Sequence, residues 1–428
     1  MTLFSISCIM ETLIDEGNDG WMADERGAAF SPERRQARRY DTPYRSRRMT
    51  DRVYMEDVLE GEERRQAYRE FGERLKSFYP EKSRYNIYFG ELHGHSCLSD
   101  GQPSPDEYFQ SIRDRAKLDF AALTDHTHGG IGGATLYGEK GETLREAAIR
   151  YNDSGMFSTL FGYEIEAYPY YNNAVVYHRD FTGELFRSAV DGDVTAEELR
   201  ELLNREDRLL VPHDTYHIEA GADLGRIDPD LFAPLIEIYS REDSAEYFGN
   251  PQNRESGGMC RGGCWQDALL RGAKMGCIAA SDDHNLTNGL TLDGVEGIGK
   301  YPGITGVLCE ENTPGAIFRA LKARRCYGFT GGRMWIDFRI NGRYMGEEIA
   351  AEGDREIYFS VRADAPIDRL VLLKNCREYM FTRRSEQMLY DYQAESECDV
   401  YYLRVELQDG RVGWTSPIWV HQDKTERE

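Results

Sequence analysis

From position 86 to position 330, short apolar runs alternate with segments that have the periodicity of helices. The runs read NIYFGEL, DFAALT, STLFGYEI, NAVVYH, RLLVP, PLIEIYS and GCIAAS. This alternation is typical of βα units, whose strands lie in a largely parallel sheet. Because repeated βα units can roll into a barrel, the sequence predicts an α/β domain of this kind over 86–330.

Two of the helical segments begin with strong start signals. Ser104 and Glu107 have the spacing of a capping box, with Pro105 at the first helical position. Thr195 and Glu198 repeat the box. Each box satisfies two backbone N–H groups that the first turn of a helix leaves unpaired. These signals predict helices that begin at the residues after Ser104 and Thr195.

After position 330 the pattern changes to alternating apolar and polar residues, as in MWIDFRI, REIYFSVRA and VYYLRVEL. Asn341-Gly342 and Asp409-Gly410 lie between such runs. Both dipeptides favour tight hairpin turns, whose central residues need positive φ. The sequence therefore predicts a small antiparallel domain over 331–428 that resembles a β-sandwich.

The first 85 residues are polar, lack strand patterns and contain an arginine-rich stretch, ERRQARRYDTPYRSRR. We expect a polar and partly helical arm over 1–85, to which we assign no chemistry. Contact of the arginines with an anionic partner is the alternative to a solvated arm.

Charge and composition exclude several classes of protein. The chain has 52 basic and 75 acidic residues, a net charge of -23, which disfavours broad nucleic-acid binding but not divalent metals. No apolar run approaches the roughly 20 residues of a membrane-spanning helix. Nine scattered cysteines, an odd number, suggest reduced thiols, and the amino terminus lacks the basic region of a signal peptide. We therefore expect a cytoplasmic protein; the sequence does not determine its oligomeric state.

Histidines are concentrated in the predicted βα domain, where eight of the nine lie between positions 93 and 284. Residues that bind metals in proteins follow the end of nearly every predicted strand: His93, His95, Asp125, His126, Glu164, His178, His213, Asp282 and His284. The carboxyl ends of barrel strands meet on one face, so these side chains are expected to form one cluster.

Imidazole nitrogens together with carboxylate oxygens suit Zn²⁺, Mn²⁺ or Fe²⁺. In an extended segment, His93 and His95 point to the same side, because side chains alternate with a period of two. For His178, an ordinary buried histidine on a strand is as good an interpretation as a ligand. His217 is interpreted either as a contact to a second ligand shell or substrate, or as a surface residue.

The motifs LHGHSCLSDG, LTDHTH, GYE, VPHD and ASDDHN, in this order, resemble the PHP (polymerase and histidinol phosphatase) superfamily of metal-dependent phosphoesterases. Later stretches are similar to a branch in which a strand domain follows the barrel. The resemblance covers roughly 86–420 and implies a distorted (β/α)7 barrel with two or three divalent metal ions (Zn, Mn or Fe) at the carboxyl ends of its strands.

The resemblance also implies roles for individual residues. The ligands of the first metal would be His93, His95, Glu164 and Asp282; Glu164 would bridge to a second metal, also bound by His213; and Asp100, His126 and His284 would bind a third. The segment after Glu164, YYNNAVVYHRD, departs from the family pattern, so that either His178 or one of Asn172 and Asn173 would complete the second site.

A metal centre of this kind predicts a hydrolase without a protein nucleophile. Asp125 and Asp214 flank ligands and are candidates for orienting their rings. Arg241 and Arg333 are candidates for binding a phosphate group, with surface salt bridges as the alternative. We predict a phosphoesterase of small phosphorylated metabolites or short nucleotides. The alternatives are hydrolysis of an ester, lactone or amide bond, and a non-catalytic, metal-stabilised binding protein.

Overall fold

The computed structural model describes residues 84–127, 136, 138–171, 173–186, 194–217, 221–241, 243–250, 259–292, 301–351 and 353–422. All of them belong to one compact unit of the chain. The predicted arm over 1–85 lies almost entirely outside the described residues, as does Asn172.

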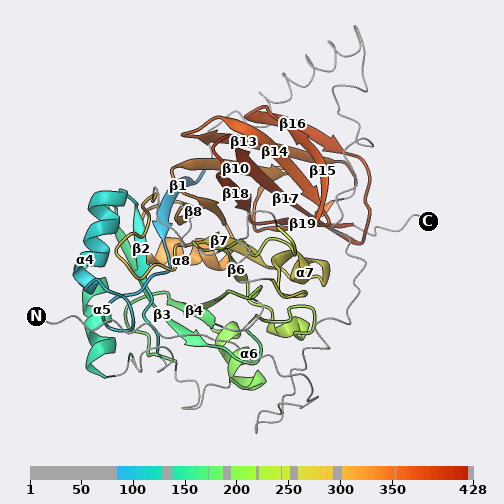
Figure 1. Ribbon diagram of the computed structural model, residues 1–428. Coiled ribbons are helices and arrows are strands. Elements are labelled where there is room, and N and C mark those ends of the chain that lie inside the picture. The colour runs from blue at the N-terminus through green and yellow to red at the C-terminus, as the bar shows by residue number, and fades with distance from the viewer. Residues whose placement is uncertain are drawn as a thin grey trace, which may run out of the picture. The chain divides into compact units, whose positions relative to one another are not determined.

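The first half of the described chain mixes strands and helices, as the sequence predicts (Figure 1). Its strands are β1 (Asn86–Glu91), β2 (Phe120–Leu123), β3 (Ser158–Glu166), β4 (Asn173–His178), β5 (Arg208–His213), β6 (Leu235–Tyr239), β7 (Gly276–Ala279), β8 (Gly303–Cys309) and β9 (Cys326–Thr330). Its helices are α4 (Pro105–Gln110), the π-helical η2 (Ser111–Ala116), α5 (Glu139–Tyr151), α6 (Ala196–Asn204), the 3₁₀ turn η3 (Pro229–Leu231), α7 (Trp265–Leu270) and α8 (Pro314–Lys322).

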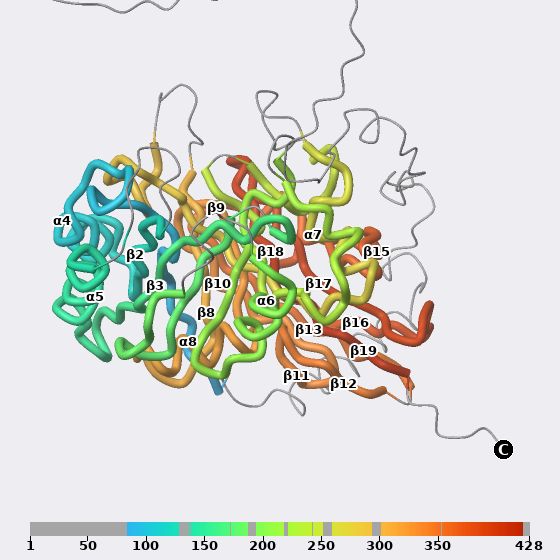
Figure 2. Tube along the Cα trace, turned by 90° about the horizontal axis from the view of Figure 1, so that it is seen from below, coloured from blue at the N-terminus to red at the C-terminus, as the bar shows by residue number. Residues whose placement is uncertain are grey.

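Both predicted capping boxes are present. The Ser104 side chain accepts a hydrogen bond from the backbone of Glu107 at the start of α4, and Thr195 does the same for Glu198 at the start of α6. Helices α4 and α5 lie beside β2 and β3, as both views show (Figures 1 and 2).

A thirteen-stranded sheet forms the centre of the fold, and part of its order is β9-β8-β1-β2-β3-β4-β5. Strands β1, β2 and β3 are parallel, whereas β4, β5, β8 and β9 run antiparallel to their neighbours. The expectation of a largely parallel sheet is therefore met only in part. Between β3 and β4 the reason is plain: their connection is a short turn, and a parallel return needs a crossover of a dozen or more residues.

Strands β6 and β7 form a separate parallel pair. Strand β5 contacts β6, and β7 contacts β8 and β9. The described strands thus establish a mixed α/β fold with one large sheet, and a closed (β/α)7 barrel stays a prediction.

The second half of the described chain consists of strands. They are β10 (Met334–Ile340), β11 (Arg343–Tyr344), β12 (Glu348–Ala351), β13 (Arg355–Ala363), β14 (Ile367–Lys374), β15 (Arg377–Thr382), β16 (Glu386–Asp391), β17 (Cys398–Leu407), β18 (Val412–Thr415) and β19 (Ile418–Gln422). The order of a four-stranded sheet is β11-β10-β13-β16, and the other six strands belong to the large sheet. Buried side chains of both sheets, such as Phe338 and Leu403, share one hydrophobic core.

Strand β18 pairs with β9, so the large sheet runs through the predicted domain boundary at 330/331, which stays a prediction. At the predicted turn after β10, Asn341 and Gly342 both have positive φ, at 49° and 74°. At the turn between β17 and β18, Gly410 has positive φ at 88°. The turns could therefore be predicted from the sequence. The pairing of β9 with β18 in one sheet could not.

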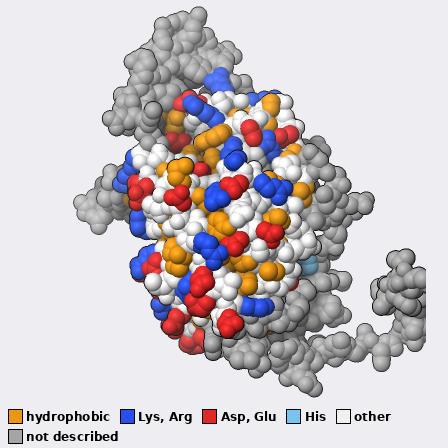
Figure 3. Space-filling model, turned by 90° about the vertical axis from the view of Figure 1, so that its left-hand side faces the viewer, with side chains coloured by type: hydrophobic (Ala, Val, Ile, Leu, Met, Phe, Trp, Pro, Cys, Tyr) orange, Lys and Arg blue, Asp and Glu red, His pale blue; other side chains and the backbone are white. Residues whose placement is uncertain are grey.

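Three further observations concern the described helices, cysteines and surface. Within the described ranges, no helix has the length and apolarity that crossing a membrane requires. The cysteines in those ranges are free thiols. On the side that is at the left in Figure 1, acidic and basic side chains are interspersed with apolar ones (Figure 3).

Candidate metal centre

The predicted ligands lie together at the carboxyl ends of strands β1, β2, β3, β5 and β7. His93 and His95 follow β1, His126 follows β2, Glu164 lies near the end of β3, His213 ends β5, and Asp282 and His284 follow β7. Single bridges link these segments across the cluster, Gly94 to Asp283 and His126 to Glu164.

Glu164 lies at the centre of the cluster. Its Oε2 atom is 3.4 Å from Nε2 of His93 and 3.3 Å from Nε2 of His95. It is also 3.2 Å from Nδ1 of His126, while Oε1 is 2.7 Å from Nε2 of His213. A carboxylate whose two oxygens face different histidines has the geometry to bridge two cations.

Asp282 completes the buried part of the cluster. Its Oδ1 atom is 3.0 Å from Nε2 of His95 and 3.5 Å from Nε2 of His93. Its Oδ2 atom is 3.9 Å from Nδ1 of His213. The φ of Asp282 is 48°, an uncommon value for a residue other than glycine, and such values cluster at functional sites.

Asp100, His126 and His284 form an outer group. Oδ2 of Asp100 is 3.7 Å from Nε2 of His126 and 3.4 Å from Nε2 of His284. The His284 side chain is 34% exposed and those of His126 and Asp100 about 20%, whereas His93 and His95 are fully buried. We call the inner part of the centre, His93, His95, Glu164, His213 and Asp282, its floor. The outer group of Asp100, His126 and His284 forms a more exposed rim.

These side chains suit divalent metal ions. Four sets offer ligand atoms within 4.8 Å of one another: His93 with His95 and Asp282; His93 with Glu164 and His213; His213 with Asp214 and Asp282; and His95 with Asp100, His126 and His284. Buried Oδ1 of Asp100 makes no hydrogen bond to any described residue, which leaves it available as a ligand atom. Nitrogen and carboxylate donors of this kind fit Zn²⁺, Mn²⁺ and Fe²⁺.

Without metal, the histidines and carboxylates of the floor perturb each other. Burial favours the neutral form of Glu164, but the charges of His126 and His213 outweigh it and hold its pKa well below the usual range. Burial likewise opposes protonation of His95, but Asp282 and Glu164 raise the pKa of His95 to about 9. In the metal-free state, protons on the histidines therefore offset the carboxylate charges.

Asp125 and Arg241 lie beside the centre but contact the loops that carry the ligands. Asp125 accepts hydrogen bonds from the backbone and hydroxyl groups of Ser96 and Ser99, with the hydroxyls at 2.7 and 2.6 Å. Arg241 is buried, pairs with Asp283 at 3.0 Å and donates to the backbone oxygen of Leu290 at 2.6 Å. Both residues thus hold loops in place.

His213 and Asn173 are register partners at the site end of β4 and β5, while His178 pairs with Arg208 at the other end. Asn173 and His178 are five positions apart in β4, a distance of roughly 16 Å along the strand. The structure therefore places Asn173, and not His178, beside the ligands. Asp214 also lies there, with Oδ2 3.5 Å from Nδ1 of His213.

The structure does not bring the other two predicted site residues into the ligand sets. His217 forms an isolated bridge with Met259. Arg333 donates to the backbone oxygens of Ala116 and Lys117, which precede β2, so it lies at the amino end of the strands.

Sequence reasoning missed two buried glutamates. Glu91 accepts hydrogen bonds from the backbone of His93 and from the backbone and hydroxyl of Ser281. Glu237 lies 2.9 Å from Nδ1 of His93. Each stands as a lone carboxylate within an apolar strand, NIYFGEL or PLIEIYS, and that pattern was the available signal.

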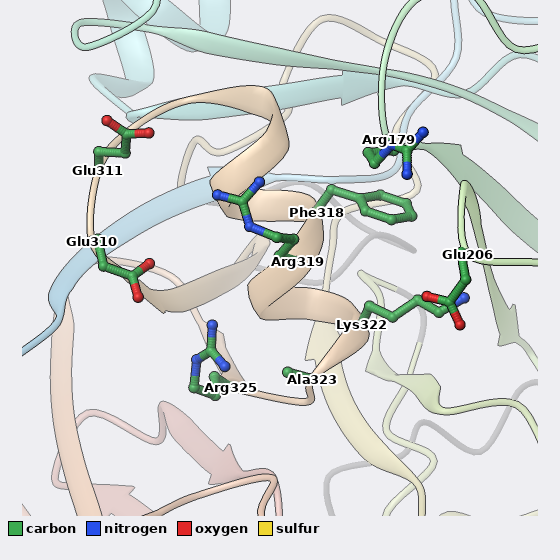
Figure 4. A pocket seen from close by; sticks show the side chains of 9 residues that line it. All are labelled: Arg179, Glu206, Glu310, Glu311, Phe318, Arg319, Lys322, Ala323 and Arg325. Atoms are coloured by element: carbon green, nitrogen blue, oxygen red, sulfur yellow. The ribbon is translucent and has the colours of Figure 1, made fainter.

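A cavity of about 660 Å³ lies away from this centre. Figure 4 shows the charged side chains that line it, including Arg319 and Lys322 of α8, Glu310 after β8 and Glu206 before β5. Glu206 precedes β5 and His213 ends it, so the cavity and the metal centre lie at opposite ends of the strands.

Comparisons with known proteins give distant matches, and no family model matches the chain. An uncharacterized protein of Chlamydia pneumoniae is 24% identical over 365 residues, and the match covers 78% of this chain but 57% of that relative. The chain thus spans little more than half the length of this relative.

Two solved structures are also similar. One is a two-domain protein from Bacteroides vulgatus that contains a predicted PHP-like metal-dependent phosphoesterase. Its TM-score is 0.41 and its sequence identity is 15%, and the match covers 79% of this chain and 97% of that one. The other, from Bifidobacterium adolescentis, is provisionally named a metal-dependent phosphoesterase; its TM-score is 0.28 at 14% identity, over 49% of this chain and 92% of that one. The PHP resemblance itself stands on its motif residues, which the structure gathers into one centre.

Proposed function

We propose that this chain is a metal-dependent phosphoesterase that hydrolyses small phosphorylated metabolites or short nucleotides. The observation that carries the proposal is the position of Glu164, whose carboxylate lies within 3.4 Å of four histidines. Two or three divalent ions would be held by the floor around Glu164 and by the outer group of Asp100, His126 and His284.

Bound metal would supply Lewis acidity, which lowers the pKa of water from 15.7 to about 7 and stabilises charge on a phosphoryl group. The residues of the chain supply binding and orientation. His93, His95 and Glu164, which are buried, and Asp282, which is 13% exposed, would bind from the inner side of the centre. Because Asp100, His126 and His284 are the exposed ligands, the substrate would approach over them.

The fold supports this proposal through the position of the ligands. They lie at or near the carboxyl ends of strands β1, β2, β3, β5 and β7, which is the arrangement expected for a site at the carboxyl face of a distorted (β/α)7 barrel. We propose that barrel over 86–330 and a β-sandwich-like domain over 331–428.

We propose small substrates because of charge. A long polyanion that approaches a chain of net charge -23 meets repulsion from every phosphate that no metal neutralises. A small ester presents a single group to the metals. A cytoplasmic location and reduced thiols remain part of the same proposal.

The test measures phosphate release from sugar phosphates, mononucleotides and short oligonucleotides with Mn²⁺, Zn²⁺ or Fe²⁺. Replacing Asp282 by Asn or His284 by Gln should lower the rate more than tenfold, equivalent to about 1.4 kcal/mol. His178→Gln is the control, because this histidine lies at the far end of β4.

Three results would contradict the proposal. If either ligand variant keeps more than a tenth of the rate, the role of that residue is wrong. Hydrolysis of carboxylic esters or lactones without phosphate release would identify a carbonyl hydrolase. Metal binding with no hydrolysis of any kind would identify a binding protein.

A further inference from the structure

Glu237 is a buried carboxylate in the middle of β6. Its neighbours along the strand, Ile236 and Ile238, are fully buried apolar residues, and Glu237 itself is 2% exposed. Burying a carboxylate is unfavourable unless it is paired, because the charge loses its hydration. An apolar residue at this position would satisfy the packing of the strand, so the carboxylate calls for another explanation.

Its partner is a predicted metal ligand. Oε2 of Glu237 lies 2.9 Å from Nδ1 of His93, and both side chains are buried. The other oxygen, Oε1, makes no hydrogen bond to any described residue. The contact with His93 is therefore the hydrogen bond that orients this carboxylate.

The two nitrogens of His93 face different surroundings. Nδ1 faces Glu237, whereas Nε2 faces Oε2 of Glu164 at 3.4 Å and Oδ1 of Asp282 at 3.5 Å. A carboxylate at Nδ1 favours the tautomer with a proton on that nitrogen. Nε2 then keeps its lone pair directed into the centre of the cluster.

We infer that Glu237 is a positioning residue, which holds the proton of His93 on Nδ1 and thereby makes Nε2 the metal-binding nitrogen. The inference rests on the proposed metal centre and deepens it. Carboxylates that accept from a ligating histidine also raise its basicity, and their loss typically costs 10- to 100-fold in metal affinity.

Glu91 offers a useful contrast. It is equally buried and also near the centre, but its hydrogen bonds come from backbone groups and the hydroxyl of Ser281. Glu91 thus holds the course of the chain after β1 and β7, whereas Glu237 holds one ring. Substitution of Glu237 should consequently change metal binding more than folding.

The experiment uses the full chain and Zn²⁺ as the probe. Zinc affinity is measured by competition with a chelator for the wild type, Glu237→Leu and Glu237→Gln. We expect a 10- to 100-fold loss of affinity in Glu237→Leu, and a smaller loss in Glu237→Gln, because the glutamine oxygen still accepts from Nδ1. Glu246→Gln is the control, since Glu246 is equally buried but contacts Tyr402, Arg404 and Trp414. It should keep the affinity of the wild type.

A spectroscopic readout separates positioning from a structural role. Long-range proton–nitrogen NMR of the zinc-loaded, ¹⁵N-histidine-labelled protein reports which nitrogen of each ring is protonated. The His93 signal is assigned by its loss in His93→Asn. We expect His93 to be protonated at Nδ1 in the wild type and in Glu237→Gln.

Several outcomes would overturn the inference. Coordination of zinc through Nδ1 of His93 in the wild type would do so even if Glu237→Leu failed to fold. A folded Glu237→Leu protein with affinity within twofold of the wild type would also do so. Absence of zinc binding by the wild type is a different result, because it refutes the proposed metal centre itself.

Discussion

His178 is a buried histidine whose surroundings should make the folded protein less stable in acid. The side chain is 1% exposed and packs against the ring of Phe161, with Nε2 3.4 Å from the hydroxyl of Tyr163. Burial, reinforced by the positive charges of Arg208 and Arg145, lowers its pKa from 6.5 to about 4. The folded protein therefore holds His178 neutral from pH 7 down to about pH 4.

The sign of the effect follows from proton binding. Between pH 6.5 and pH 4 the unfolded chain binds a proton at His178 and the folded chain does not, so acid favours unfolding. Each pKa unit is worth about 1.4 kcal/mol. For a shift from 6.5 to about 4, the free energy of unfolding should fall by about 2 kcal/mol at pH 5 and about 3 kcal/mol at pH 4, relative to pH 7.

Urea unfolding of the metal-free protein at pH 7, 5 and 4 tests this prediction. The quantity of interest is the difference between the wild type and His178→Gln, because it isolates the contribution of this one side chain. The variant should lose about 2 to 3 kcal/mol less than the wild type on acidification. Equal losses for the wild type and His178→Gln would refute the reasoning.

Further predictions concern the metals and the helix caps. The chain purified without chelator should retain two or three equivalents of divalent metal by elemental analysis, and less than one after reconstitution would contradict the ligand assignment. Because the pKa of His95 is raised to about 9, protons compete with metal for this side chain, and zinc affinity should rise with pH from 6 to 9. Titration calorimetry in buffers of different ionisation enthalpy should show that zinc binding releases protons. Thr195→Ala removes the hydroxyl that accepts a hydrogen bond from the backbone of Glu198 at 3.2 Å, and should lower the free energy of unfolding by about 1 kcal/mol in chemical denaturation. Thr143→Ala, on the exposed side of α5, is the control and should change the free energy of unfolding less.

Local structure and the types of the candidate ligands could be predicted from residues that lie close together in the chain. Capping boxes at Ser104 and Thr195 and the positive φ at Asn341-Gly342 depend on residues close together in the chain, so their patterns are readable without a fold. The ligand-type residues at the ends of apolar runs predicted a single cluster, and the structure brings five histidines, Glu164 and Asp282 together with Asp100. Each of these residues lies at or near the end of its own strand, and the general rule that strand ends of a βα domain share one face predicted their convergence.

Contacts between segments far apart in the chain set the surroundings of the predicted ligands. The register of β4 against β5 puts Asn173 beside His213 and carries His178 to the far end, and no local pattern sets that register. Arg333 contacts the residues before β2, and Arg241 closes on Asp283, because of packing between segments far apart in sequence. Glu237 and His93 are 144 positions apart, and their 2.9 Å contact exists only because the fold brings β6 close to the residues that follow β1. Pairing over such separations depends on the three-dimensional arrangement of the strands, which the order of residues along the chain does not display.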